Sequence, residues 1–484
     1  MAAAPHYPRV SRYKTAEAFR THLQELSIEL PLDEKILTAA EGSPLAQPIE
    51  IFGRLIGNRW CIHPMEGWDG ESNGMPSEHT LRRWRRFGES GAKVIFGGEA
   101  SAVCHQGRSN PYQLLAVPAN KNGFAALLNV LKQQHKQLYG TADDLLIGLQ
   151  LTHSGRFSKP NSSDRPEPRI LFHHPILDKR VGVAPHDDSA IMTDGEIEEL
   201  IERYADAAKM AYDAGFDFVD LKHCHGYLGH EFLSAHTREG QYGGAFANRT
   251  RFLRNLAQRI RAEVPGLHLA VRLSAFDLIP FRPAQDGVGV PEPYEHLLPY
   301  RYGFGVDVLN PLQYDLSETF QFLSEMEELG IELANITGGS PYYNPHIQRP
   351  ALFPPSDGYE PPEDPLTGAA RLIQVARIIK AKFPRMKIIG TGYTYLQEFL
   401  PHAAQAAVRE GWTDMVGIGR MALIYPNLPA DCLTRGAVDS KRLCRTFSDC
   451  TTAPRHGMIS GCYPLDEYYK TMPEAARVKA IKKK

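Results

Sequence analysis

Units in which an amphipathic helix is followed by a short apolar strand constrain the fold of this chain more than any other feature. The clearest unit begins at Thr193, where Thr-Asp-Gly-Glu has the form of a capping box that starts a helix. Apolar and small residues recur at helical spacing up to Gly215, a left-handed stop, and the apolar strand 216–221 follows. The same order recurs over 366–390 and 396–419. This alternation predicts a parallel sheet covered by helices.

Further apolar segments complete the set of predicted strands. With 216–221, 386–390 and 414–419, eight strands are predicted, the other five being 60–62, 93–96, 145–151, 268–273 and 331–336. Eight parallel strands favour an α/β fold of the (β/α)₈ barrel type, although an open doubly wound sheet has similar periodicity and stays as an alternative. We expect the barrel over residues 51–435, an N-terminal extension over 1–50 and a C-terminal extension over 436–484.

Charge and composition exclude several classes of partner. The formal net charge is −2, and Lys and Arg are scattered among Asp and Glu, so neither nucleic acid nor a membrane is expected to bind. The first residues are basic but no apolar signal-peptide core follows, so we expect a cytoplasmic protein. Seven cysteines, an odd number, argue against a disulfide framework. A small-molecule substrate is the expected partner, and a homo-oligomer is compatible with the sequence.

Two proline-rich stretches, 159–185 and 278–299, interrupt the unit spacing just after predicted strands. In a barrel such loops rise over the face that carries the active site and shape the substrate pocket. The alternative interpretation, a solvated surface insertion, has equal weight from the sequence.

Polar residues gather where the predicted strands end. The first strand is followed by Pro64, Met65 and Glu66, and the fourth by Lys222-His-Cys-His225-Gly-Tyr227. Gln150 and Arg272 lie near the ends of the third and fifth strands. Because the carboxyl ends of barrel strands open into one cavity, these side chains are predicted to form a single site.

Five motifs in a fixed order resemble the Old Yellow Enzyme family of FMN oxidoreductases over about residues 50–430. They are Asn58-Arg59 with Pro64-Met65, Gln150-Leu-Thr-His-Ser-Gly-Arg156, His225-Gly-Tyr-Leu228, Tyr242-Gly-Gly with Asn248-Arg249, and Gly419-Arg420. The resemblance implies an NAD(P)H:flavin oxidoreductase that passes hydride through FMN to a small activated alkene or carbonyl-conjugated substrate. One alternative is a dehydrogenase that oxidises an amine, alcohol or sugar-like substrate. Another is a barrel that binds a small ligand without turnover.

The needs of a flavin suit several of these positions. Negative charge that develops near N1 and O2 of the ring requires a fixed cation, for which Arg272 is the candidate. Gln150 can both donate to and accept from the pyrimidine edge, and backbone around Pro64, Met65 and Ala100 is expected along the ring. The simpler alternative is that Gln150 and Arg272 only cap strand ends. The phosphate is expected after the last two strands, at Gly392, Tyr393, Gly419 and Arg420.

The resemblance also assigns catalytic roles, with two departures from the family. His225 would bind the substrate oxygen and Tyr227 would donate a proton, while Lys222 stands where the family has a first histidine. A lysine there polarises a carbonyl, holds a carboxylate or points away. Glu66 stands where the family usually has Thr or Cys beside the flavin, and it either lowers the reduction potential of the ring or pairs with Lys222.

The C-terminal cysteines resemble a degenerate iron–sulfur segment of the longer trimethylamine dehydrogenase and dienoyl-CoA reductase relatives. The pattern is Cys444-x₂-Phe447-x₂-Cys450-x₁₁-Cys462, with Phe447 in place of one ligand. Because a four-iron cluster normally has four thiolates, we expect buried structural cysteines and no metal in the site.

Overall fold

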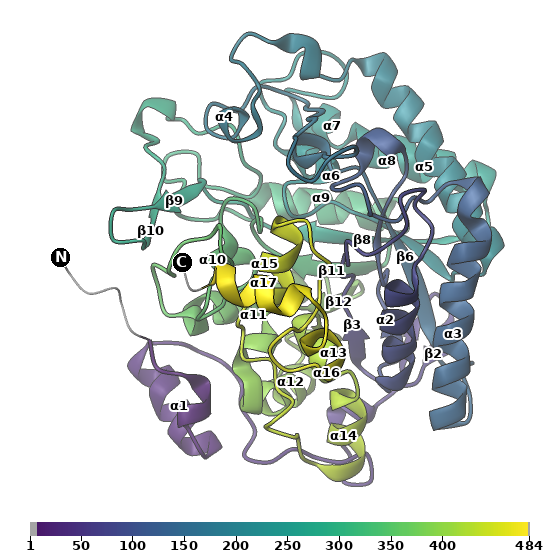
Figure 1. Ribbon diagram of the computed structural model, residues 1–484, viewed down its shortest axis with the longest axis vertical. Coiled ribbons are helices and arrows are strands. Elements are labelled where there is room, and N and C mark those ends of the chain that lie inside the picture. Colours follow the sequence, from purple (N-terminus) through teal and green to yellow (C-terminus); the bar gives the residue numbers. More distant parts are fainter. Residues whose placement is uncertain (1–6, 483–484) are drawn as a thin grey trace.

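Eight parallel strands close into a barrel in the computed structural model, which describes residues 7–482 (Figure 1). The ring runs β3 (Trp60–Ile62), β4 (Val94–Ile95), β6 (Leu146–Thr152), β7 (Phe218–Leu221), β8 (His268–Ser274), β11 (Leu333–Thr337), β12 (Lys387–Gly390) and β13 (Met415–Ile418). The ring closes where β13 pairs with β3, with Val416 opposite Trp60. The predicted (β/α)₈ barrel is confirmed, and the open doubly wound alternative is wrong.

The second strand of the ring is broken in a way that the sequence did not reveal. After β4 the chain turns at Gly97 and Gly98, both with positive φ, and continues as β5 (Ala100–Ala102), which also pairs with β6. A Cβ atom on Gly97 would lie 2.9 Å from the backbone nitrogen of Gln150, so a side chain there would displace the chain. The break sets Ala100 directly opposite Gln150.

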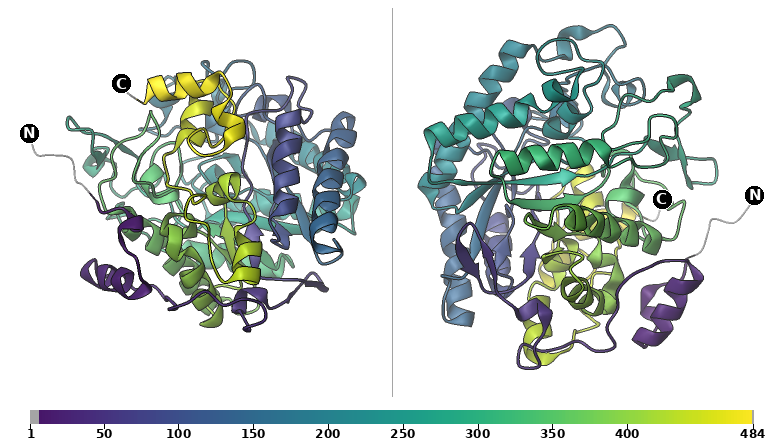
Figure 2. Two further views of the ribbon diagram at one scale, coloured as in Figure 1. Left: turned by 60° about the horizontal axis from the view of Figure 1, so that its bottom comes forward. Right: turned by 180° about the vertical axis from the view of Figure 1, so that it is seen from behind.

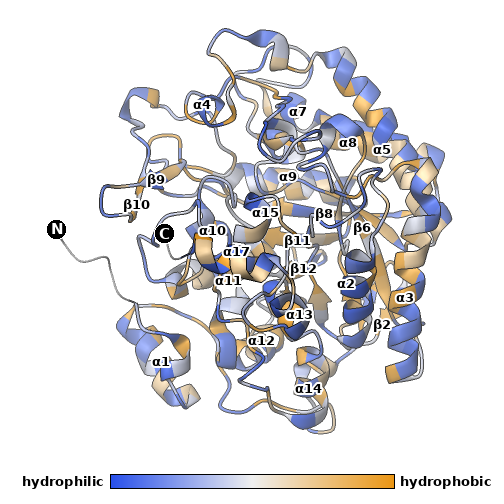
Figure 3. Cartoon of the chain, viewed as in Figure 1, coloured by the Kyte–Doolittle hydropathy of each residue, from blue (hydrophilic) through white to orange (hydrophobic). Residues whose placement is uncertain are grey.

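Helices surround the ring and turn their apolar faces toward it (Figures 2 and 3). The principal ones are α2 (Glu78–Glu89), α3 (Lys121–Tyr139), α5 (Asp194–Ala214), α8 (Arg251–Glu263), α9 (Ser317–Glu328), α11 (Pro365–Lys382) and α12 (Leu400–Arg409). Helix α5 starts as predicted, with both hydrogen bonds of the Thr193–Glu196 capping box, and ends at Gly215, whose φ is 98°. No helix within residues 7–482 has the length and apolar character that crossing a membrane requires.

The helix expected over 396–409 starts later than its periodicity suggests. Residues Tyr393–Phe399 form a 3₁₀ helix, in which Gln397 has non-helical dihedral angles, and α12 begins at Leu400. Pro401 has no N–H with which to bond the carbonyl of Gln397, so an α-helix can contain this proline only in its first turn.

One end of the barrel is plugged. The antiparallel hairpin of β1 (Ile49–Ile51) and β2 (Arg54–Ile56) packs its isoleucines against inward-facing strand residues such as Phe218. The predicted domain boundary at residue 51 therefore falls inside an element that belongs to the barrel. Because apolar side chains fill this end of the barrel, a cavity can form only at the other end, where the carboxyl ends of the strands lie.

The two predicted loops and the C-terminal extension lie around that open end. The first loop contains the short helix α4 (Asp178–Val181), and the second carries the hairpin of β9 (Phe281–Pro283) and β10 (Gly289–Pro291) (Figure 1). After α13 (Arg420–Ile424) and α14 (Leu428–Arg435), the chain returns through α15 (Asp449–Arg455), α16 (Glu467–Lys470) and α17 (Glu474–Ile481). Residues of α15 line the cavity at this open end.

An aromatic pair, together with ion pairs such as Arg409–Asp33, docks the N-terminal extension on the barrel. Helix α1 (Ala16–Glu25) is capped by Thr15 and inserts Phe19, which is fully buried, against Phe399. The two rings stack with centroids 4.3 Å apart and an interplanar angle of 6°.

We predict that Phe19→Ala lowers the free energy of unfolding by about 3–5 kcal/mol, because it opens a cavity between the extension and the barrel. Tyr212→Ala, at a residue that is 47% exposed, serves as the control and should cost less than about 1 kcal/mol. Urea unfolding followed by fluorescence measures both. A loss below about 1 kcal/mol in Phe19→Ala would show that the extension adds little to barrel stability.

Candidate active site

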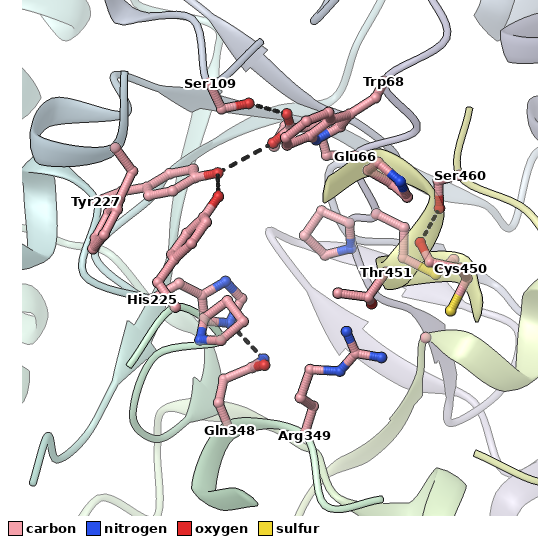
Figure 4. A pocket seen from close by; sticks show the side chains of 18 of the residues that line it. Glu66, Trp68, Ser109, His225, Tyr227, Gln348, Arg349, Cys450, Thr451 and Ser460 are labelled. Carbon is pink, nitrogen blue, oxygen red and sulfur yellow. Dashed lines mark hydrogen bonds between the residues drawn. The ribbon is translucent and has the colours of Figure 1, made fainter. Parts of the chain in front are cut away.

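A cavity of about 460 Å³ opens at the carboxyl ends of the barrel strands (Figure 4). Nearly all of the residues predicted for the site line it, namely Pro64, Met65, Glu66, Ala100, Gln150, Lys222, His225, Tyr227, Arg272, Gly392, Gly419 and Arg420. Segments that are far apart in the sequence therefore converge here, as the strand-end pattern predicted.

Tyr393 is the one predicted residue that does not line the cavity. Its ring is buried, and its hydroxyl has no hydrogen-bond partner among the described residues. The preceding Gly392 has a φ of 97°, and a Cβ atom there would lie 2.9 Å from the carbonyl oxygen of Ala369. Glycine is therefore required at 392, while a role for the backbone of Tyr393 stays a prediction.

Asp220 connects the two residues predicted to face a flavin. It lies in β7, fully buried, and accepts hydrogen bonds from Gln150 Nε2 at 2.5 Å and from the backbone nitrogen of Arg272 at 2.7 Å. Burial raises the pKa of Asp220 to about 6, although these two bonds oppose the rise. No motif in the sequence marks Asp220, for which the only signal is a carboxylate inside an apolar strand. Gln150 is thus held in place by Asp220.

Three arginine side chains in the cavity lack a carboxylate partner. Within residues 7–482, Arg272, Arg349 and Arg420 each keep a buried guanidinium nitrogen without a hydrogen bond: Nε, Nη2 and Nη1 respectively. Arg272 Nη1 reaches only the carbonyl of Pro64 at 3.5 Å, and Arg420 Nη2 donates to that of Pro350 at 3.0 Å. Unsatisfied buried donors are costly, so this arrangement favours an anionic ligand. No motif marked Arg349.

A chain of hydroxyl and carboxyl groups surrounds Tyr227. Its Oη lies 2.7 Å from Oη of Tyr342 and donates to Glu66 Oε2 at 3.4 Å. Oε1 of Glu66 accepts from Asn110 Nδ2 at 2.9 Å and from the hydroxyl of Ser109 (Figure 4). Burial raises the pKa of both Glu66 and Tyr227, and the neighbouring carboxyl raises the pKa of Tyr227 further. No motif in the sequence marks Tyr342.

Lys222 does not pair with Glu66. Its ammonium group lies 3.8 Å from the centroid of the Tyr227 ring, and no ion pair or hydrogen bond joins it to any residue that the structure describes. Burial lowers the pKa of Lys222. The pairing hypothesis is wrong because Glu66 is held instead by Ser109, Asn110 and Tyr227.

His225 is held in an unusual backbone conformation. Its φ is 67°, its N–H donates to Ser274 Oγ at 3.0 Å, and its Nε2 lies 3.0 Å from Nε2 of Gln348 (Figure 4). Burial and the nearby cations Arg272 and Lys222 keep the pKa of His225 well below its usual value, so the imidazole is neutral. Because the Gln348 nitrogen can only donate, Nε2 accepts and Nδ1 carries the proton.

A buried charge network holds the loop that carries Glu66. Arg83 donates to Asp69 Oδ2 at 2.5 Å and to Glu99 Oε1 at 2.9 Å, and the backbone nitrogen of Gly67 donates to Glu99. The carbonyl of Gly67 accepts from Ser460 in the C-terminal extension. Helix α2 and the extension therefore fix the position of the first strand loop.

The remaining predicted features have mixed outcomes. Cys444, Cys450 and Cys462 are free thiols that are only partly buried, which differs from the predicted buried cysteines, and Cys450 lines the cavity. In the described range 7–482, no group of three or more His, Cys, Asp and Glu side chains is arranged to bind a metal. Lys159, Leu177 and Arg180 line the cavity, so the loop 159–185 shapes it. The second loop contributes instead to a neighbouring cavity of about 190 Å³.

Comparisons with known proteins place this geometry in a family. The sequence model of the NADH:flavin oxidoreductase / NADH oxidase family matches residues 44–292. An NADPH dehydrogenase of Bacillus velezensis is 31% identical over 232 residues, which is 47% of this chain and 61% of the relative. The chain thus spans less than two thirds of the length of that relative.

Two solved structures share the fold. Histamine dehydrogenase from Rhizobium sp. 4-9 is 20% identical, with a TM-score of 0.62 over 86% of this chain and 51% of that one. The old yellow enzyme homologue from Zymomonas mobilis is 21% identical, with a TM-score of 0.53 over 80% of this chain and 91% of that one.

We predict that Asp220→Asn changes the pH dependence of stability. The pKa of Asp220 rises from 3.8 to about 6 on folding. As the pH falls, the native state therefore binds this proton at a higher pH than the unfolded state does. The wild-type protein should therefore lose stability relative to the variant as the pH rises from about 4 to about 6, by on the order of 3 kcal/mol. Urea unfolding without added ligand at several pH values measures the difference. Parallel pH profiles for the two proteins would contradict the prediction.

Proposed function

This chain belongs to the NADH:flavin oxidoreductase / NADH oxidase family, and from that premise we propose that its cavity binds FMN. We propose further that the protein is an NAD(P)H:flavin oxidoreductase whose acceptor is a small activated alkene or carbonyl-conjugated compound. The observation that carries the proposal is the set of unsatisfied guanidinium donors of Arg272, Arg349 and Arg420 in one cavity. A ligand with a phosphate and an anionic ring edge would satisfy them.

The residues present suit this cofactor. Arg272 would supply the cation for the N1 and O2 edge of the ring, and Gln150, held by Asp220, would bind the pyrimidine edge. Backbone at Pro64, Met65 and Ala100, which line the cavity, would pack along the ring. Arg349 and Arg420 would hold the phosphate, together with backbone at Gly392, Tyr393 and Gly419. When bound, FMN supplies the hydride chemistry.

The substrate is oriented and protonated by the chain itself. His225 carries a proton on Nδ1, which has no partner among the described residues and can donate to a substrate oxygen, next to the cation of Lys222. Tyr227 donates the proton to the substrate carbon, because its raised pKa keeps the hydroxyl protonated at neutral pH. Tyr342, 2.7 Å away, and Glu66 are placed to return a proton to Tyr227.

We predict that Arg349→Met weakens FMN binding by about 10- to 100-fold and leaves riboflavin binding unchanged, because riboflavin lacks the phosphate. Arg377→Met is the matched control, since Arg377 lies on the surface and pairs with Glu29. Quenching of flavin fluorescence measures both ligands. A purified protein that shows no flavin absorption band and does not take up FMN would refute the proposed function.

We predict that Tyr227→Phe slows substrate reduction by at least about 100-fold, because the proton donor is lost. Reduction of the flavin by NAD(P)H should change by less than about 3-fold, since this half-reaction needs no proton from Tyr227. Stopped-flow absorbance separates the two half-reactions. Tyr343→Phe is the control, because Tyr343 bonds Asp277 outside the cavity.

Equal losses in both half-reactions would remove Tyr227 from the donor role. Rapid bleaching of the flavin by an amine or alcohol without NAD(P)H would favour the dehydrogenase alternative.

A further inference from the structure

We propose that the substrate of this site carries a carboxylate group and that Lys222 is its counter-ion. The inference rests on the proposed oxidoreductase function and deepens it, because it names the substrate class as a flat, unsaturated organic acid.

The ammonium group of Lys222 is a buried charge without a counter-ion. The residue is 6% exposed, lines the cavity, and forms no ion pair or hydrogen bond with residues 7–482. Its one favourable contact is the face of the Tyr227 ring, 3.8 Å from Nζ. A buried ammonium group that lacks an anionic partner destabilises the protein, so its retention requires a compensating role.

Glu66 and Asp220 are the two carboxylates whose charge acts on Lys222, and both are hydrogen-bonded to other donors. Glu66 accepts from Ser109 and Asn110 at Oε1 and from Tyr227 at Oε2. Both oxygens of Asp220 are likewise bonded, to Gln150 and to the backbone of Arg272. Neither side chain lies within 4.0 Å of the lysine nitrogen, so the protein leaves this cation to a ligand.

The other cations that line the cavity are bonded elsewhere: Arg156, Arg180 and Arg455 pair with Asp178, Glu292 and Asp357, and Lys159 donates to the carbonyl of Ser163. Arg272, Arg349 and Arg420 are assigned above to the ring edge and phosphate of the cofactor. Lys222 is instead close to Tyr227 and His225, the two residues proposed to act on the substrate. Lys222 is therefore the cation that stays unpaired after cofactor binding, and it lies beside the residues proposed to act on the substrate.

The walls beside Lys222 favour a flat ligand. Tyr342 stacks on Phe157 with centroids 4.2 Å apart, and Tyr227 lies 5.8 Å from Tyr342, centroid to centroid. Trp68 also lines the cavity, with a backbone φ of 53°. Aromatic walls pack well against planar unsaturated groups, while a carboxylate bonded to Nζ forms the charge-assisted hydrogen bonds that a neutral carbonyl cannot match.

The test compares benzoate with benzamide, which have the same shape and differ in charge. Isothermal titration calorimetry on the protein saturated with FMN, so that the three arginines are occupied, should show tighter binding of benzoate by about 10- to 100-fold. Lys222→Met should abolish this preference, and Lys222→Arg should retain most of it. Lys209→Met is the matched control, because Lys209 is an exposed lysine paired with Asp213 on α5, and the preference should persist in it.

Thermal unfolding gives a second measurement that does not depend on activity. Without ligand, Lys222→Met should be at least as stable as the wild type, because an unpaired buried charge is removed. Benzoate should raise the Tm of the wild type and not that of the variant.

Two results would overturn the inference: equal affinity of the wild type for benzoate and benzamide, or a benzoate preference that survives in Lys222→Met. The absorption spectrum of the same protein before FMN is added tests the proposed function separately. A missing flavin band would refute FMN binding, whereas calorimetry would still report whether Lys222 selects the carboxylate.

Discussion

Pairing between β13 and β3 is the interaction on which the rest of the structure depends. It joins the last strand of the ring to the first, with Val416 opposite Trp60 and Ile418 opposite Ile62. Once the ring is closed, all the strand ends face one space, and the opposite end is filled by the hairpin of β1 and β2. A cavity lined by residues from 63 to 460 is the consequence.

Charge in that cavity is distributed unevenly. The carboxylates Glu66 and Asp220 are bonded to neighbouring donors, so their oxygens are occupied. The cations Lys222, Arg272, Arg349 and Arg420 have no carboxylate partner among the described residues, and the three arginines also keep a buried nitrogen unsatisfied. A site arranged in this way is stable with anionic groups inside it. That requirement agrees with a phosphate-bearing cofactor and, on our inference, with an acidic substrate.

The C-terminal extension and helix α2, which lie outside the strand ring, hold residues of the site in place. The C-terminal extension places Cys450 and Arg455 on the cavity wall, and Ser460 bonds the loop that carries Glu66. Helix α2 holds the same loop through Arg83. The described part of the extension, residues 436–482, thus contributes to the candidate site, which its lack of periodicity did not indicate.

Local patterns in the sequence determined the strand and helix order, the capping of α5 and the set of residues that end the strands. These features depend on neighbouring residues and on burial of one face, so periodicity and capping chemistry are sufficient to predict them. The positions of Lys222, His225, Tyr227, Gln150 and Arg272 at one site followed from the barrel topology.

Only the tertiary structure decided which of these groups contact one another. Asp220, Tyr342 and Arg349 entered the site because distant strands and loops brought them there, and no local pattern marks such contacts. The same holds for Lys222, whose sequence position left three roles open. Lys222 has no partner because Glu66 is bonded to Ser109 and Asn110 instead. Long-range packing determines which donors contact a buried carboxylate, so the sequence could not decide this.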